Sequence, residues 1–247
     1  MWLVDGQWSV AEEKTSEERH ASLSFEKMVN TYKSMTVDGI SYLTKSSFAI
    51  LVLIKASGAL SFGSIDVLNV SLSHVEGDEN GDSRRLGILF GVMGLGCLVG
   101  PLVAEKFIEM TEPRSMLTAC VIGYAFISAG FVGIGISSTF ASVCIATFIR
   151  GIGSSVMWVN STLLLQKFSA KEKLGRVLSV DFSLCTLVLA LSAFAAGYLE
   201  DHARMTPEQI SWVMAILGLA SFFTWGAYLM RGGGPAGTSS TIDREEP

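Results

Sequence analysis

Two charged residues, Lys55 and Asp66, interrupt an otherwise apolar stretch between residues 46 and 73. They are eleven residues apart, and at about 100° per residue a continuous helix turns about 20° beyond three full turns between them, so they share one face. Asn69 falls close to the same line. Because an unpaired charge in hydrocarbon costs at least about 2.5 kcal/mol, this polar stripe should face protein or water. The alternative for Lys55 is a position near the cytosolic helix end, from which its ammonium reaches the membrane surface.

A second charged position, Arg150, follows an uncharged run that reaches back to residue 115. Ser154, Trp158 and Ser161 continue its face of a helix, and Asn160 lies to one side. A guanidinium stays charged at any cellular pH, so inside a membrane it needs a polar partner or water. Two roles remain open: substrate or proton handling, and a structural role in which the charge holds helices together.

The residue types that other kinds of chemistry require are missing or misplaced. The three histidines, His20, His74 and His202, lie outside the apolar stretches or at their edges, which argues against an intramembrane serine protease. No phosphate-binding Gly-Lys-Ser/Thr loop, metal-ligand cluster or disulfide framework is present, so no cofactor is predicted. A formal net charge of −5 gives no reason to expect nucleic acid. The sequence therefore predicts a protein that is not an enzyme.

The elements that position these residues are predicted to be membrane-spanning helices. Hydrophobic residues make up 49% and charged residues 17% of the chain, and its mean hydropathy is +0.45. Because a helix rises about 1.5 Å per residue, about 20 apolar residues cross about 30 Å of hydrocarbon. Runs of this length recur and predict an all-α, polytopic membrane protein. Its six spans are expected near residues 46–73, 86–108, 115–137, 139–167, 174–199 and 209–230.

The spans form one predicted transmembrane domain, residues 46–230. It lies between a polar, partly amphipathic leader, residues 1–45, and a tail, residues 231–247, whose glycine, serine and threonine content predicts disorder. The six spans place eleven lysines and arginines on one side of the membrane and three on the other. Because basic residues collect in cytosolic loops, both termini are expected in the cytosol. The kind of membrane stays open.

The six spans also suggest two groups of three. Lys55 with Gly58 in the first span is similar to Arg150 with Gly153 in the fourth. Because three is an odd number, the second group would have the opposite orientation to the first, as in transporters built from inverted repeats. Chance similarity between apolar helices explains the pattern equally well.

Three stretches resemble the major facilitator superfamily, and specifically the C-terminal six-helix half of its twelve-helix members. Residues 150–158, Arg-Gly-Ile-Gly-Ser-Ser-Val-Met-Trp, are similar to the arginine-plus-glycine signature of the corresponding helix in each half. Residues 174–177, Leu-Gly-Arg-Val, resemble the cytosolic start of the next helix in drug-efflux-like members. Residues 100–106 resemble the glycine-to-acid-to-base loop motif, although the acid is displaced by one position and the downstream Gly-Arg pair is absent.

The resemblance implies alternating access, in which two six-helix halves rock about a substrate site near the bilayer midplane. The residues that we expect around this site are Lys55, Asp66, Asn69, Arg150, Trp158 and Asn160. Asp66 or Arg150 is expected to couple transport to protons, and Glu105 with Arg176 to form a cytosolic gate. The expected partners are a small organic solute, protons, the lipid bilayer, and either a missing N-terminal half or a second copy of the chain. A non-transporting membrane scaffold is the alternative function, and a channel is a third.

Overall fold

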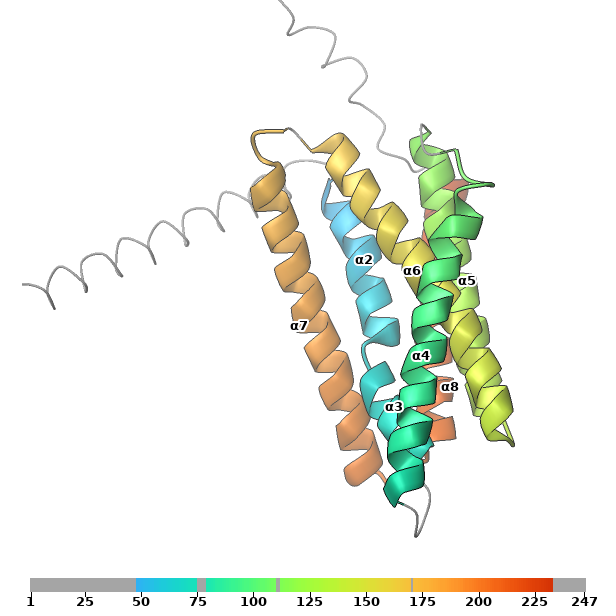
Figure 1. Ribbon diagram of the computed structural model, residues 1–247. Coiled ribbons are helices and arrows are strands. Elements are labelled where there is room, and N and C mark those ends of the chain that lie inside the picture. Colours follow the sequence, from blue (N-terminus) through green and yellow to red (C-terminus); the bar gives the residue numbers. More distant parts are fainter. Residues whose placement is uncertain (1–47, 75–78, 110–111, 170, 233–247) are drawn as a thin grey trace, which may run out of the picture.

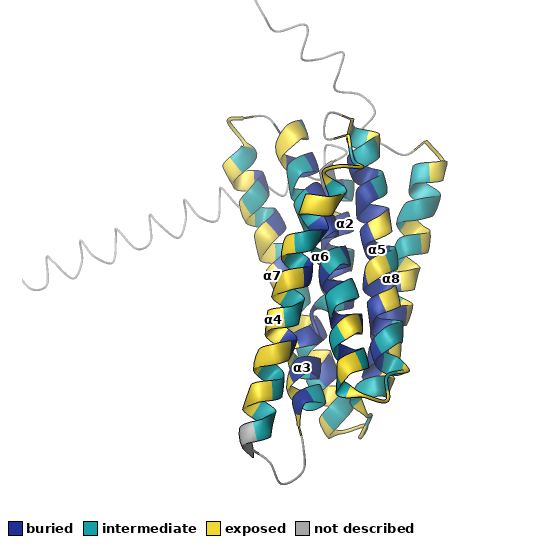
Figure 2. Cartoon of the chain, turned by 45° about the vertical axis from the view of Figure 1, so that its right-hand side comes forward, coloured by how far each residue is buried: buried dark blue, intermediate teal, exposed yellow. Residues whose placement is uncertain are grey.

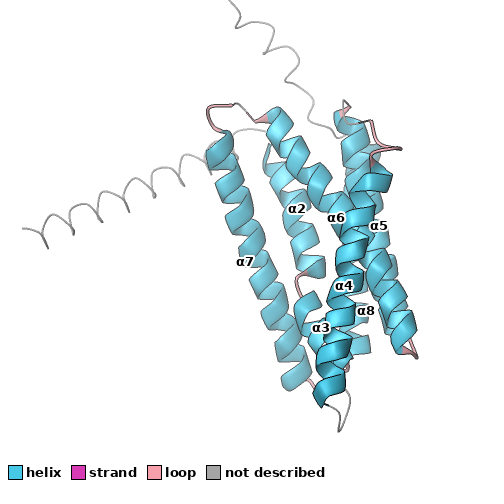
Figure 3. Ribbon diagram, viewed as in Figure 1, coloured by secondary structure: helices cyan, strands magenta, loops and turns pink. Residues whose placement is uncertain are grey.

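The computed structural model describes residues 48–74, 79–109, 112–169 and 171–232. Within these ranges the chain is helical and contains no strand, which confirms the all-α prediction. In chain order the helices are α2 (Phe48–Phe62), α3 (Ile65–Ser73), α4 (Glu79–Ala104), α5 (Pro113–Gly135), α6 (Phe140–Phe168), α7 (Leu174–Asp201) and α8 (Pro207–Met230). Figure 1 shows one bundle of roughly aligned helices, and Figure 3 shows short loops at its two ends.

Six segments of the described chain are long and apolar enough to cross a membrane. The helices α2 and α3 together form the first, Ala49–Ser73, and each of the other five helices forms one. The predicted boundaries agree closely except at the second span, where α4 begins at Glu79 and ends at Ala104. This helix starts earlier than predicted because it continues through polar residues before its apolar run begins. The predicted leader and the tail from residue 233 lie outside the described residues.

The six crossings bring alternate loops to the same end of the bundle. The start of α2, the end of α4, the start of α7 and the end of α8 lie at one end of the bundle, which is the upper end in Figure 1. Prolines and caps define several helix starts: Pro113 and Pro207 occupy first turns, and the Thr206 side chain accepts a hydrogen bond from the Gln209 backbone N–H.

The core lies where α5 and α6 pack against α2 and α8. Gly123 on α5 and Gly153 on α6 face each other, and a Cβ on Gly153 would lie only 2.5 Å from the Gly123 carbonyl oxygen. The absence of side chains there lets the two backbones approach closely. Tyr124 and Phe131 of α5 are fully buried. Much of the surface of α4, α7 and α8 is exposed, as Figure 2 shows for α4 and α7.

A break between α2 and α3 corrects the prediction that Lys55 and Asp66 share one face. The chain leaves the helix at Gly63 and Ser64, where a Cβ on Gly63 would lie 2.8 Å from the Cβ of Ser192 on α7. The Ser192 hydroxyl donates a 2.8 Å hydrogen bond to the carbonyl of Leu60 at this break. The break interrupts the regular rotation of about 100° per residue on which the prediction depended, and the two side chains differ in burial: Lys55 is buried and Asp66 is exposed.

Candidate functional site

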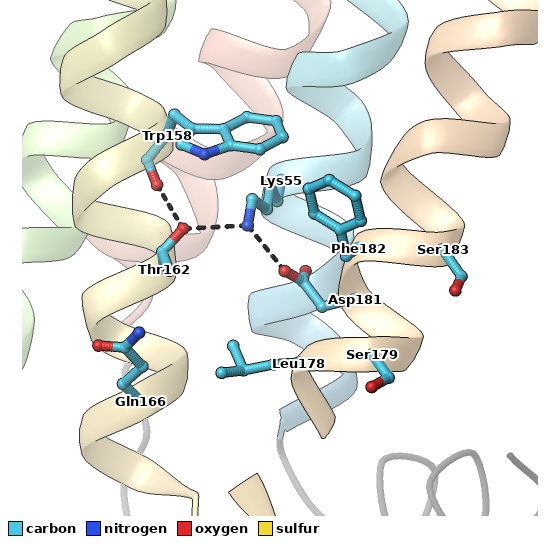
Figure 4. A pocket seen from close by; sticks show the side chains of 9 residues that line it. All are labelled: Lys55, Trp158, Thr162, Gln166, Leu178, Ser179, Asp181, Phe182 and Ser183. Atoms are coloured by element: carbon cyan, nitrogen blue, oxygen red, sulfur yellow. Dashed lines mark hydrogen bonds and ion pairs between the residues drawn. The ribbon is translucent and has the colours of Figure 1, made fainter. Parts of the chain in front are cut away.

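A cavity of about 510 Å³ opens between α2, α6 and α7. Lys55 reaches it from α2, Trp158, Thr162 and Gln166 from α6, and Leu178, Ser179, Asp181, Phe182 and Ser183 from α7. Figure 4 shows Lys55, Thr162 and Asp181 meeting in the space between α6 and α7. The cavity forms because α7 packs mainly on α2 and barely touches α6.

A buried ion pair forms one wall of this cavity. The Lys55 Nζ lies 2.7 Å from Asp181 Oδ2, and the two side chains are 4% and 2% exposed. The ammonium also donates a 3.0 Å hydrogen bond to Thr162 Oγ1, which itself donates a 2.8 Å hydrogen bond to the carbonyl of Trp158. The lysine Nζ lies 4.3 Å from the centroid of the Trp158 ring, within the range of a cation–π interaction. Three helices are therefore joined at one ammonium group.

Side chains of two other helices form hydrogen bonds to the turn of α2 that carries Lys55. The Tyr124 hydroxyl of α5 donates a hydrogen bond to the Ile54 carbonyl. The Trp225 Nε1 of α8 donates a 2.8 Å hydrogen bond to Ser57 Oγ, two residues after the lysine. Ser57 Oγ also lies 2.8 Å from the Tyr124 hydroxyl oxygen. These contacts fix the direction in which Lys55 leaves the helix.

The second buried cation, Arg150, lies on α6 away from this cavity. Its side chain is 1% exposed, and its guanidinium carbon lies 5.5 Å from the centroid of the Phe131 ring. Neither Nε nor Nη2 has a hydrogen-bond partner among the residues that the structure describes. The Asp66 carboxylate is close enough to act electrostatically on the guanidinium, although no ion pair joins the two described side chains.

One of the comparisons with known proteins identifies the family of the chain. The family model described as Major Facilitator Superfamily matches residues 47–245, which is most of the chain. The chain belongs to this superfamily. Comparison with curated proteins and with solved structures gives no match. Members of the superfamily are membrane transporters, and the six apolar segments make this chain an integral, multi-pass membrane protein.

In this superfamily member, two of the six residues predicted around a substrate site, Lys55 and Trp158, meet at the cavity. Asp66 and Arg150 lie elsewhere, as described above. Asn69 is buried, and neither of its side-chain amide atoms has a hydrogen-bond partner within the described ranges. Asn160 is also buried, and its amide donates a 2.8 Å hydrogen bond to the Val156 carbonyl. These four residues do not line the cavity.

The two predicted gating residues lie at the same end of the bundle. Glu105 follows the last residue of α4, Arg176 lies in the first turn of α7, and both are exposed. The structure describes no ion pair that joins these two side chains. Their gating role stays a prediction.

Sequence reasoning missed Asp181, which is the partner of Lys55. Asp181 lies within the span predicted at residues 174–199, but the charge-free run of this region begins at Phe182, and the acid was not considered as a charge inside the span. The apolar residues Val177, Leu178 and Val180 just before it were the available signal, because they show that the apolar segment already includes Asp181. Thr162 carried no comparable signal, since a hydroxyl is common in such helices.

Proposed function

We propose that the chain is one six-helix unit of a secondary active transporter that moves a small organic solute by alternating access. Membership of a superfamily of transporters supports the general activity. The cavity of about 510 Å³ within the apolar bundle supports a small organic solute rather than a bare ion. In this proposal both termini are cytosolic, and the drug-efflux-like stretch at residues 174–177 favours export.

The observation that carries the proposal is the buried Lys55–Asp181 pair at the cavity wall. Charges within a membrane are costly and commonly mark substrate or ion pathways. A solute or a proton that reaches Asp181 would weaken its hold on Lys55 and thereby loosen the contact between α2 and α7. The pair can therefore link an event in the cavity to a movement of helices, and Asp181 becomes the residue that we propose for proton coupling.

The second unit is proposed to pack on α4 and α7. Both helices expose large apolar side chains on the bundle surface, including Leu95 and Leu98 on α4 and Leu187, Leu191 and Phe194 on α7. Figure 2 shows these two helices as strongly exposed. Either an N-terminal half or a second copy of the chain would fill this role, and it would close the open side of the cavity.

The test is solute-dependent proton movement in vesicles that contain the purified chain, with its second unit if that unit co-purifies. A panel of neutral, cationic, anionic and zwitterionic solutes is added outside, and solute uptake and internal pH are followed. The variants Lys55→Met and Asp181→Asn should abolish coupled movement. The matched controls, Lys171→Met in the α6–α7 loop and Asp201→Asn at the end of α7, should retain it because both side chains are exposed. If no solute moves, or if the two cavity variants transport normally, the proposal is wrong.

A scaffold function remains the second candidate, because a closed, buried ion pair can also serve only to join helices. Flux through the native chain and through one variant separates these possibilities. Replacing both charges by apolar side chains, as in Lys55→Met with Asp181→Leu, keeps helix packing but removes the charges. Transport that survives in the double variant would show that the pair only joins helices within a transporter, whereas a native chain that moves no solute would favour the scaffold function.

A further inference from the structure

The surroundings of the Lys55 ammonium form a recognition site for an ammonium group in general. A carboxylate oxygen, a hydroxyl oxygen and the face of an indole ring surround the same nitrogen at 2.7, 3.0 and 4.3 Å. These are the three kinds of group that bind organic ammonium ions in proteins. Lys55 fills this site from within the chain, at the wall of a cavity large enough for an external ligand.

Asp181 has capacity for a second interaction. Among the described residues, hydrogen bonds reach only its Oδ2 atom, and Lys55 is the donor. The carboxylate lines the cavity beside Ser179 and Ser183, and Figure 4 shows it between α6 and α7. A carboxylate accepts several hydrogen bonds at once. A ligand ammonium can therefore reach Asp181 before Lys55 has moved away.

Charge balance then limits which ligands fit. The pair is neutral overall, and both partners are buried. A ligand that is only a cation pairs with Asp181 and leaves the Lys55 charge unpaired. A ligand that is only an anion pairs with Lys55 and leaves the Asp181 charge unpaired. An unpaired charge in such surroundings is strongly unfavourable. A zwitterion gives each residue a new partner and leaves the site neutral.

Besides the polar Gln166, Ser179 and Ser183, apolar side chains line the cavity. Phe182, which is 63% exposed, and Leu178 stand beside Asp181, and Trp158 lies opposite on α6. Lysine carries its ammonium on a flexible four-carbon stem, so Nζ can follow a ligand carboxylate over a short distance. The space thus combines a cationic site, an anionic site and an apolar surface.

We propose that this cavity binds a small zwitterion of the amino-acid type with an apolar or aromatic side chain. Its ammonium takes the place of the Lys55 Nζ between Asp181, Thr162 and Trp158, and its carboxylate binds Lys55. The inference rests on the proposed transport function for its biological meaning, but binding can be measured without transport.

The test compares three probes that share one phenyl scaffold: free phenylalanine as the zwitterion, phenethylamine as the cation and 3-phenylpropionate as the anion. Binding to the full chain in lipid nanodiscs is measured by calorimetry at pH 7. Phenylalanine should bind about tenfold more tightly than either single-charge probe, since each charged hydrogen bond contributes about that factor. In Lys55→Met, phenylalanine should no longer bind more tightly than phenethylamine. In Asp181→Asn, phenylalanine should no longer bind more tightly than 3-phenylpropionate.

A single substitution can unfold the bundle, so the double variant Lys55→Met with Asp181→Leu is measured alongside. It should fold and bind the three probes with similar affinity. The inference is overturned if none of the probes binds the native chain, if phenethylamine binds as well as phenylalanine, or if the double variant keeps the preference. Tight binding of 3-phenylpropionate that increases as the pH falls would also overturn it, because an anion would then enter with a proton. Intact zwitterion preference without any flux would refute only the transport proposal.

Discussion

Removing one charge of the Lys55–Asp181 pair should destabilise the bundle far more than removing both. Two unit charges 2.7 Å apart attract by about 6 kcal/mol at an effective dielectric constant of about 20. Solvent screens little of this, because the side chains are only 4% and 2% exposed. Loss of one partner leaves the other charge buried, which lowers the free energy of unfolding by about 3–5 kcal/mol. Apolar side chains at both positions should cost close to nothing.

The measurement is a double-mutant cycle on the purified chain in mixed micelles, unfolded by titration with dodecyl sulfate and followed by far-UV circular dichroism. The variants are Lys55→Met, Asp181→Leu and the two combined, and Lys171→Met and Asp201→Asn serve as exposed controls. The coupling free energy should exceed about 3 kcal/mol, while both controls should stay within about 0.5 kcal/mol of the native chain. Additive effects of the two cavity substitutions would refute the reasoning, because they would mean that the pair carries no mutual stabilisation in the membrane-like environment.

Three further predictions concern other parts of the chain. Gly130→Ala should lower the free energy of unfolding by about 1–3 kcal/mol, because the new Cβ would overlap the backbone of Arg150. The control Gly197→Ala should not destabilise the chain, because its Cβ would meet open space. Equal effects of the two substitutions would contradict this packing. Arg150→Gln should reach the membrane in near-normal amount yet lose solute flux, with Arg150→Lys partly active; normal flux, or failure to accumulate, would leave Arg150 a structural residue. Tags at both termini should be inaccessible from outside intact cells, whereas a tag within residues 77–83 should be reachable, and termini on opposite sides would contradict the six-span topology.

The sequence alone was sufficient for the six spans and for the superfamily. Both depend on local properties: charge-free runs of bilayer length, and short stretches such as residues 150–158. It also indicated that Lys55 and Arg150 would not face lipid, because a charge within an apolar span is strongly unfavourable unless it contacts polar groups or water. Both side chains are in fact buried. The ends of α4 could not be predicted from the sequence as closely, because a helix can continue beyond the membrane through polar residues.

Only the tertiary structure decided which groups meet. The partner of Lys55 is 126 residues away on α7, and nothing in the spacing of residues along one helix could select Asp181 over the nearer Asp66. The helix breaks at Gly63 and Ser64, and beyond the break Asp66 is exposed whereas Lys55 is buried. A helix interior has a regular rotation that can be counted from sequence. The place where that rotation stops, and the helix that packs against the break, depend on contacts between distant segments.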